Sequence, residues 1–433
     1  MTMQRFVGLD FGTTNTALAM VDHRGAASLA RFASAHGPTP TFRSIVFFEA
    51  EKLDAERRPA VIAGPRAIES YLACGGAGRL LQSLKSFLAS PLFKSTNVFG
   101  AVYSLEELIA MLLRQLRAEA ELEFGDLGRR AVLGRPVRFV NAEPDGNEDF
   151  PLGRLRAAAA LAGFDDVVLE YEPVAAAHFY EASLDHDELV LIADFGGGTS
   201  DFSLMRVGPG IRKRGRVAAD MLGTEGVGVA GDAFDSQIVN HALAPSLGMG
   251  TFYQSYFDKK QIPVPPWIYE RLRRWHHLSF LKSRETMHFL REIRAQSLSP
   301  EKIDALIHVV DDDLGYYLYQ TVEGAKFTLS SAASTRFAFS DPPMELDHMI
   351  ARNEFERWIE PETVAIAACL DRLMTRTGIV PRDVDRVFMT GGSSFVPVVR
   401  QLFASRFGEG KLSAGNELTS VASGLALRAR ELG

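Results

Sequence analysis

One short sequence pattern occurs twice in this chain. The copies, residues 7–16 and 191–201, each contain an apolar stretch that runs into Asp-Phe-Gly and then into Gly or Thr residues, and a second apolar stretch follows each copy, at 17–21 and 202–207. Glycine allows a tight turn and lets the backbone approach a ligand closely. Successive backbone N–H groups in such a turn form an anion-binding concavity. The repeat therefore predicts two similar strand–turn–strand units, and an internal duplication of this kind indicates two similar lobes with a cleft between them.

The chemistry of the repeated turn indicates a nucleotide. Asp10 and Asp194 stand at the ends of the two apolar stretches. A carboxylate is a suitable ligand for a hard, hydrated cation such as magnesium. Two such turns on one chain indicate a nucleoside triphosphate held from both sides, with a metal ion between the turns.

Composition limits the other classes of function. The chain has 433 residues, 46% hydrophobic and 23% charged, which is ordinary for a globular protein of more than one domain or of two lobes. The net charge of −7 gives no global basic field for nucleic acid or membrane. Cys74 and Cys369 are too few for a disulfide framework and fit a reducing cytoplasm. We see neither a signal peptide nor an apolar run of membrane-spanning length, so we expect a cytoplasmic location without a membrane partner.

Local patterns predict alternating strands and helices. The best helix is 104–123, where Ser104 and Glu107 form a capping box before a one-face apolar pattern. Residues 172–177 open another helix, with Glu172 at its start and Pro173 at its first helical position. Such alternation indicates a mixed α/β fold. The other predicted strands are 44–48, 131–133, 167–169 and 387–390, and the other predicted helices are 80–88, 152–162, 234–241, 314–330 and 421–432.

Together with a late Gly391-Gly392-Ser393 turn, these motifs resemble the actin/hexokinase-type ATPases, which have duplicated ribonuclease H-like lobes and a central nucleotide cleft. Within that group, residues 6–430 most resemble the nucleotide-binding domain of the heat-shock protein 70 family of chaperones. Several short motifs in the right order are more specific than a single glycine loop. The resemblance implies lobe I at 1–187, with an outer subdomain at about 44–125. It implies lobe II at 188–410, with an enlarged outer subdomain at about 231–340, and a C-terminal helix at 411–433 that packs back on lobe I.

The resemblance also implies roles for individual residues. Asp10 and Asp194 would hold magnesium through water, and Lys85 would reach the terminal phosphate. Glu172 would lie near the metal and the attacking water, and Thr199 and Asp201 would help to position that water and a monovalent cation, K⁺. The residues implied to bind the nucleotide from the loops are Gly12, Thr13, Thr14, Asn15, Gly196, Gly197, Gly198, Gly391, Gly392 and Ser393.

One helix carries an independent argument for adenosine. In 314–330, the residues Glu323, Lys326 and Ser330 are spaced three and four apart and so share one face, while apolar residues occupy another. The family places an arginine on each face of the adenine, and the matching positions here are Phe327 and Phe395. An aromatic ring also stacks on a flat base, so we predict an aromatic sandwich in place of a guanidinium one. A pocket that has drifted and binds nucleotide weakly is the alternative.

Each assignment has a simpler alternative. The two Asp-Phe-Gly loops could be tight turns only, and Lys85 could be a solvated surface lysine. Glu172 could be an acid favoured by the helix macrodipole, and Phe327 and Phe395 could be core residues. The histidines His276, His277 and His288 lack metal-site spacing, so we expect solvated or packing roles for them.

The basic, aromatic stretch 262–296 has the composition of a nucleic-acid patch, but the acidic chain favours contact with a protein partner or with water. The chain also ends at Gly433, just after the last helix of the nucleotide-binding domain. The resemblance therefore predicts a short member that lacks the family's linker and peptide-binding β-domain.

We therefore expect a magnesium-dependent, slowly hydrolysing ATPase of the chaperone family that binds ATP and ADP and belongs to the stress response. Its lobes would open and close to control a protein partner, which is a client, a cochaperone or an exchange factor. The alternatives are a small-molecule kinase of the same superfamily, a non-catalytic nucleotide-dependent scaffold, and a filament-forming actin relative.

Overall fold

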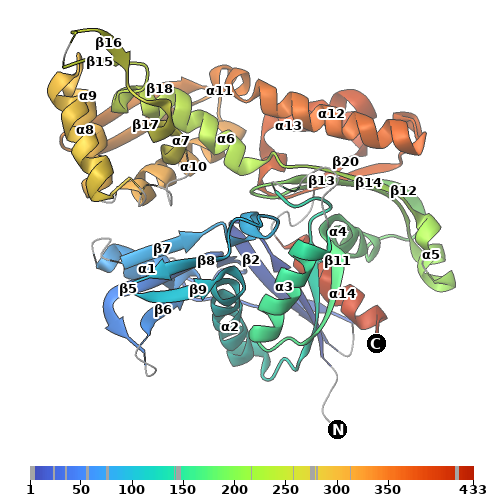
Figure 1. Ribbon diagram of the computed structural model, residues 1–433. Helices are drawn as coiled ribbons and strands as arrows, with labels where there is room; N and C mark the ends of the chain where they lie inside the picture. The colour runs from blue at the N-terminus through green and yellow to red at the C-terminus, as the bar shows by residue number, and fades with distance from the viewer. Residues whose placement is uncertain are drawn as a thin grey trace. The chain divides into compact units, whose positions relative to one another are not determined.

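The computed structural model describes residues 5–22, 25–34, 37–54, 58–74, 78–140, 142, 148–215, 217–256, 258–273, 278, 281–312, 314–414 and 419–433. The chain divides into two compact units (Figure 1). Unit 1 comprises Met1–Gly231, Val364–Ser394 and Val398–Gly433, and unit 2 comprises Asp232–Thr363 and Phe395–Pro397. Both lobe cores of the predicted division contribute to unit 1, and the lobe boundaries stay a prediction.

Unit 1 contains two sheets with the same strand plan. In the first, β1 (Phe6–Phe11) forms an antiparallel hairpin with β2 (Asn15–Val21) and lies parallel to β10 (Arg130–Arg135). In the second, β12 (Glu188–Phe195) pairs in the same way with β13 (Ser200–Val207) and β19 (Arg386–Thr390). The strand orders β11-β10-β1-β2-β3 and β20-β19-β12-β13-β14 correspond strand by strand, which confirms the duplicated actin/hexokinase-like fold. The remaining strands are β3 (Ala27–Leu29), β4 (Phe42–Arg43), β11 (Asp166–Tyr171), β14 (Met221–Val227) and β20 (Leu412–Ala414).

Two helices connect these sheets within unit 1. Helix α4 (Glu172–Glu181) packs on β12 and β13 and also touches β10 and β11, while α14 (Ser420–Glu431) packs on β1, β2, β10 and α4. The contact is close because glycine occupies it: a Cβ on Gly424 would lie 1.7 Å from the carbonyl oxygen of Ala175. On the sheet side, a Cβ on Gly8 would lie 2.2 Å from the backbone nitrogen of Ala426. Small residues therefore let the backbone of α14 approach the backbones of both β1 and α4. Because α14 contacts both elements, it links the strand that carries Asp10 to the helix that begins at Glu172.

The outer part of unit 1 shows one confirmed and one wrong prediction. Helix α2 (Leu105–Phe124) begins with the expected capping box, in which Ser104 and Glu107 each accept a hydrogen bond from the other's backbone N–H. The helix predicted at 80–88 is instead β7 (Gly78–Gln82) followed by a short 3-10 helix, η1 (Leu84–Phe87). The other elements are β5 (Ile45–Leu53), β6 (Pro59–Ala63), α1 (Pro65–Ala73), β8 (Ser95–Val98), β9 (Ala101–Ser104), α3 (Asp149–Leu161) and α5 (Pro209–Arg214).

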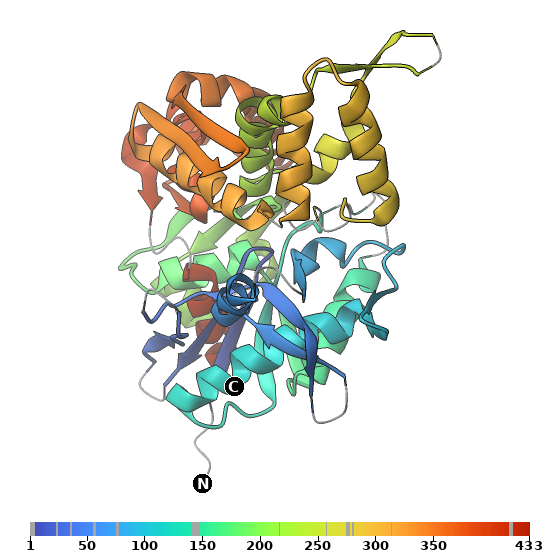
Figure 2. The ribbon, with the colours of Figure 1, turned by 90° about the vertical axis from the view of Figure 1, so that its left-hand side faces the viewer.

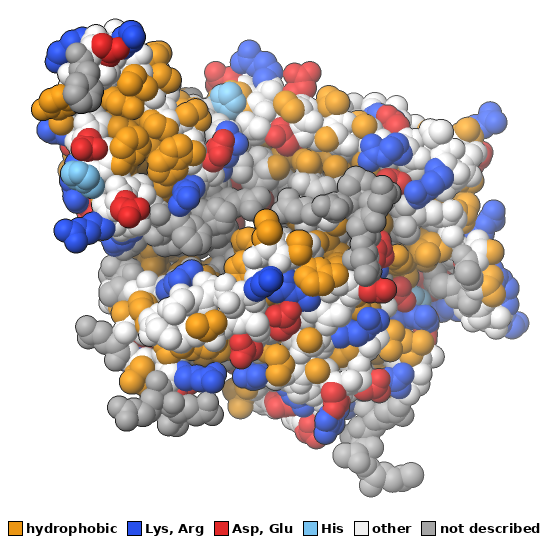
Figure 3. All heavy atoms as spheres, viewed as in Figure 1, with side chains coloured by type: hydrophobic (Ala, Val, Ile, Leu, Met, Phe, Trp, Pro, Cys, Tyr) orange, Lys and Arg blue, Asp and Glu red, His pale blue; other side chains and the backbone are white. Residues whose placement is uncertain are grey.

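Unit 2 is mainly helical. The helix predicted at 234–241 is α6 (Gly231–Ile238), which continues into the π-helix η3 (Val239–Leu243) and the 3-10 turn η4 (Ala244–Leu247). Helices α8 and α9 lie side by side, and the β15–β16 hairpin extends beyond them (Figure 2). Hydrophobic side chains remain visible on the surface at this end of the unit (Figure 3). The elements are β15 (Phe252–Gln254), β16 (Gln261–Pro263), α7 (Pro266–Leu272), α8 (Arg284–Gln296), α9 (Pro300–Asp311), α10 (Gly315–Ser331), β17 (Ser334–Asp341), β18 (Met344–Ala351) and α11 (Arg352–Trp358).

Two helices complete the chain. The long helix α12 (Glu360–Thr377) begins in unit 2 and continues into unit 1, and α13 (Pro397–Phe407) leads to β20. Among the described residues, no helix combines the length and the apolar composition that a membrane crossing requires.

Candidate functional site

The two repeated turns connect the strands of the paired hairpins. In the first turn, the Ser44 hydroxyl donates to the carbonyl of Gly12 at 2.7 Å, and the Ser44 N–H donates to the carbonyl of Thr14 at 2.9 Å. In the second turn, the Gly196 N–H donates to the carbonyl of Thr199 at 2.9 Å. In both turns, backbone carbonyl oxygens thus accept hydrogen bonds from nearby protein groups.

The two turns lie side by side. A Cβ placed on Gly198 would stand 3.5 Å from the hydroxyl oxygen of Thr13 and 3.9 Å from that of Ser86. Thr13 belongs to the first turn, Gly198 to the second, and Ser86 to η1, which also carries Lys85. The structure therefore brings three of the predicted phosphate-binding segments together, although they are far apart in sequence.

Lys85 and Glu172 form a buried ion pair, with 2.5 Å between Nζ and Oε1. Glu172 is the first residue of α4, and a Cβ on Gly134, at the end of β10, would lie 3.1 Å from its Cγ. Burial alone would lower the pKa of Lys85, but the negative charges of Glu172 and Asp10 outweigh it and raise the pKa. The alternative of a solvated surface lysine is therefore wrong, and Glu172 is more than a helix-start acid.

Three further carboxylates interact electrostatically with this ion pair. Burial, then the negative charge of Glu172, raises the pKa of Asp10 to about 7. The same two causes raise the pKa of Asp194 well above its ordinary value and that of Asp201 to about 7. Four carboxyl groups thus share one ammonium group inside the protein, which leaves a surplus of negative charge that a divalent cation could neutralise. Carboxylate oxygens such as those of Asp10 and Asp194 fit the chemistry of the predicted magnesium, and the assignment of these two residues as its ligands stays a prediction.

Asp201 is held by backbone groups that sequence reasoning missed. Its Oδ1 accepts from the N–H of Val137 at 3.1 Å and from that of Arg138 at 3.4 Å, and the Thr199 side chain also hydrogen-bonds to it. Because backbone N–H groups make these contacts, residue type could not predict them from the sequence. The only signal is position: 136–138 follow a strand, β10, whose end lies beside Glu172.

The Gly391-Gly392-Ser393 turn follows β19 directly. Thr390, at the end of β19, is registered with Asp194 on the neighbouring strand β12. Gly391 has φ of 83°, and a Cβ there would lie 1.9 Å from the carbonyl oxygen of Phe195. Only glycine fits this position, so the turn is fixed next to the second Asp-Phe-Gly loop.

The predicted adenosine-binding residues belong to unit 2. On α10, Lys326 forms a partly buried ion pair with Asp235 at 2.8 Å, and the Tyr319 hydroxyl donates to the same oxygen at 3.0 Å. The Ser330 hydroxyl donates to the carbonyl of Lys326 at 3.0 Å, one turn earlier. Burial alone would lower the pKa of Lys326, but the negative charge of Asp235, with a smaller contribution from Glu323, raises it. Of the four predicted adenosine-binding residues on α10, Glu323 and Ser330 thus both interact with Lys326. Lys326 is itself paired with Asp235.

Phe327 and Phe395 are surface residues, with 77% and 49% of their area exposed. The alternative that they belong to the core is therefore wrong. Exposed aromatic rings are what stacking on a base requires, and both residues belong to unit 2.

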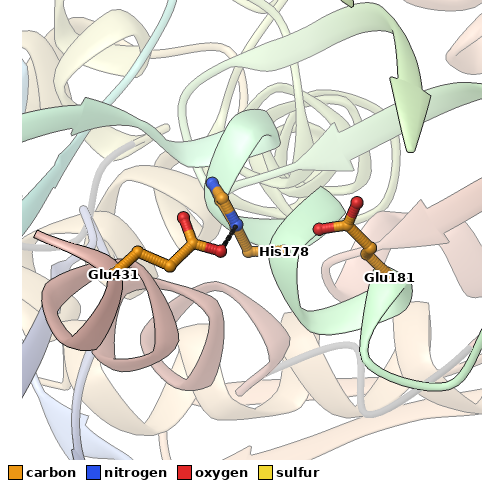
Figure 4. Close-up of side chains that lie close together, drawn as sticks. All are labelled: His178, Glu181 and Glu431. Atoms are coloured by element: carbon orange, nitrogen blue, oxygen red, sulfur yellow. Dashed lines mark ion pairs between the residues drawn. The ribbon is translucent and has the colours of Figure 1, made fainter. Parts of the chain in front are cut away.

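A second cluster with metal-ligating side chains lies at the other end of α4 (Figure 4). One atom each of His178, Glu181 and Glu431 lies within 4.8 Å of the others, and His178 Nδ1 is 3.5 Å from Glu431 Oε1. Burial would raise the pKa of Glu431, but the hydrogen bond and charge of His178, with Arg428, lower it to about 2. Glu181 accepts from the Gly208 N–H at 2.7 Å. The contact between His178 and Glu431 therefore ties α14 to α4, while Glu181 ties the end of α4 to the backbone at Gly208. Of the three histidines considered in the sequence, His288 is exposed beside Glu292, while His276 and His277 lie outside the described residues.

The carboxylate cluster predicts how the metal-free protein responds to pH. A carboxyl group whose folded-state pKa is raised contributes stability below its unfolded pKa of about 4, and this stability is lost as pH rises through the folded value. For Asp10 and Asp201 that value is about 7. We expect the melting temperature of the protein in EDTA to fall by several degrees between about pH 5 and pH 8. Magnesium-nucleotide should flatten this slope, and a melting temperature that rises over the same window in EDTA would contradict the assignment.

Paired β-sheets of duplicated plan, with glycine turns beside a buried cluster of acids and one lysine, define the class of actin/hexokinase-like nucleotide-binding proteins. The family model described as Hsp70 protein matches residues 6–246 and 295–432, so the chain belongs to the Hsp70 family. It is 24% identical over 450 residues to the chaperone protein DnaK of Thermus thermophilus, covering 99% of this chain and 61% of that protein. It is 23% identical to DnaK of Thermosipho melanesiensis, covering 98% and 58%. The chain thus spans about three fifths of the length of these relatives.

Proposed function

We propose that this chain is a magnesium-dependent ATPase whose nucleotide cycle controls a protein partner. The observation that carries the proposal is the buried Lys85–Glu172 pair among three further acids, beside both repeated turns. Membership of the Hsp70 family supports ATP as the nucleotide. Phosphoryl transfer depends on positioning and on charge neutralisation more than on covalent help from the protein.

Each group would have a distinct role. Backbone N–H groups of the turns at 12–15 and 196–198 would bind the phosphates, and Lys85 would neutralise charge at the terminal one. Glu172, Thr199, Asp194 and Asp201 would orient a water in line with the leaving oxygen. Asp10 and Asp194 would hold magnesium, which when bound would supply further charge neutralisation at the phosphates. Glu323, Lys326 and Ser330 would bind the adenosine, with the Gly391–Ser393 turn at its border. The lobes would close on ATP and relax after hydrolysis, and the partner would bind one of these two states more tightly than the other.

The direct test is phosphate release from magnesium-ATP by the purified chain with no acceptor added. We expect slow turnover that stops when EDTA removes the metal. Turnover that requires a small-molecule acceptor would indicate a kinase. Tight binding without turnover would indicate a scaffold, and ATP-dependent light scattering that grows with protein concentration would indicate a filament-forming protein.

The aromatic sandwich gives a separate prediction. Phe327→Ser and Phe395→Ser should each weaken ADP binding by about five- to tenfold, because one stacked ring contributes about 1 kcal/mol beyond the area it buries. The melting temperature should not change, since both rings are exposed. Calorimetric titration measures the affinity, with Met349→Ser, also exposed and in unit 2, as the control. Unchanged affinity in both phenylalanine variants would refute the sandwich.

A further inference from the structure

Residues 247–294 lie between the two stretches that match the family model. They include β15, β16, α7 and α8, all within unit 2. This segment is anchored: Ile268 and Leu272 of α7 and Leu290 of α8 are buried, and the Tyr269 hydroxyl donates to the carbonyl of Leu247 at 3.0 Å. The exposed residues of the segment therefore belong to elements that are packed against the rest of unit 2.

The charge of this segment is opposite to that of the chain. It holds nine Lys and Arg against four Asp and Glu, a formal charge of +5, so the remainder carries −12 of the total of −7. Acidic residues of α9 neutralise two of these charges, in the Arg291–Asp311 and Arg294–Asp304 pairs. Within the part of the chain that the structure describes, the side chains of Lys259 and Arg284 have neither a hydrogen bond nor an ion pair.

Large apolar side chains are exposed on the same segment. Tyr256 is 78% exposed, and Phe252, Ile262, Trp267 and the adjoining Leu298 are each between 37% and 49% exposed. The Leu298 N–H donates to the carbonyl of Phe252 at 2.9 Å, which places these two residues side by side. Trp267 stacks on Phe289, with the guanidinium of Arg271 5.5 Å from the Trp267 ring. Figure 3 shows hydrophobic side chains gathered at this end of unit 2, with lysine and arginine at their margins.

We propose that the outer surface of β15, β16 and α7, which we call the hairpin surface, is a docking site for an acidic, amphipathic segment of a partner protein. Exposed apolar groups would contact the apolar side chains of that segment, and the surplus lysines and arginines would pair with its carboxylates. The inference names the kind of partner that the proposed function leaves open, but binding at this surface does not require ATP turnover.

The same observations disfavour nucleic acid as the occupant. Asp258, Glu270, Glu285 and Glu292 are interspersed among the basic residues and would repel phosphates. The aliphatic side chains of Ile262 and Leu298 cannot stack on bases as aromatic rings do. A long polyanion would also meet the field of a chain that is otherwise strongly acidic, whereas a short acidic segment would meet only the basic surface.

The test is fluorescence anisotropy without nucleotide. Its probe is a labelled peptide of about 12 residues that alternates Glu with Leu and Phe. The variant Tyr256→Ser/Lys259→Glu changes two exposed residues of the hairpin. The matched control is Leu122→Ser/Arg382→Glu, which alters one apolar and one basic side chain of unit 1, each 88% exposed. Thermal melts establish that both variants are folded. We expect at least tenfold weaker binding in the hairpin variant, unchanged binding in the control, and affinity that falls with added salt.

Several outcomes would overturn the proposal. These are no binding of the peptide by the unmodified chain, equal affinity in the hairpin variant, and equal affinity for a peptide in which Ser replaces Leu and Phe. Tighter binding of a single-stranded oligonucleotide at the same residues would identify a nucleic-acid site instead. Sedimentation that shows a dimer lost in the hairpin variant would identify an interface between copies. Because nucleotide is absent, none of these results depends on whether the chain hydrolyses ATP.

Discussion

Asp194→Ala is expected to lower the rate of phosphate release from magnesium-ATP by at least about 10²- to 10³-fold, the range found when one pre-organised charge-stabilising group is removed. Asp194 is buried at the end of β12, registered with Asp201 on one side and Thr390 on the other. It is the residue assigned both to the metal and to the positioning of water, so its loss should affect both. A coupled assay of released phosphate measures the effect.

The stability of this variant separates a functional role from a structural one. Burial and the charges of Glu172 and Asp10 raise the pKa of Asp194, so its charged form is unfavourable in the metal-free protein. The variant should therefore melt at the same temperature as the unmodified chain or higher when EDTA is present. Asp126→Ala, which removes an exposed carboxylate of unit 1, should change neither quantity. Turnover retained in Asp194→Ala, or lost only because the variant unfolds, would contradict the assignment.

Local signals in the sequence predicted the parts of the fold whose contacts are local. The strand–turn–strand repeat, the Ser104–Glu107 capping box and the helix that begins at Glu172 depend on neighbours within a few residues. The prediction of a helix at 80–88 failed because β7 is defined by pairing with β5, about 35 residues earlier, which no local pattern contains. Ser83, with φ of 56°, ends the strand and leaves only a short 3-10 turn.

The candidate site shows the same limit. The acids and glycines of the repeated turns can be recognised from residue type and order, but the Lys85–Glu172 contact joins residues 87 positions apart. Only the family resemblance pointed to both residues. The backbone N–H groups of Val137 and Arg138 could not be predicted at all, because every residue except proline carries the same donor.

Lys85→Met should destabilise the metal-free protein by about 3–5 kcal/mol, the usual cost of leaving one member of a buried ion pair without its partner. Both side chains are buried, and the lysine is the cation that lowers the pKa of Asp10, Asp194 and Asp201. Without it, the four carboxyl groups would lose the counter-charge of the Lys85 ammonium group. Denaturant unfolding at about pH 8 in EDTA measures the loss. The loss should shrink toward pH 6, because Asp10 and Asp201 take up protons near pH 7.

Glu172→Gln tests the same cluster from the other side and should behave differently. Asp10 and Asp201 would still face Lys85, and the repulsion that Glu172 exerts on all three aspartates would disappear. We therefore expect less than half the destabilisation of Lys85→Met, and recovery of part of the loss in the double variant. Phosphate release should nevertheless fall about 10²-fold in each single variant, because one loses the charge proposed to face the phosphate and the other the group proposed to orient water. Equal destabilisation by the two single substitutions would mean that the pair is an isolated ion pair, and that the surplus of negative charge proposed to bind magnesium is absent.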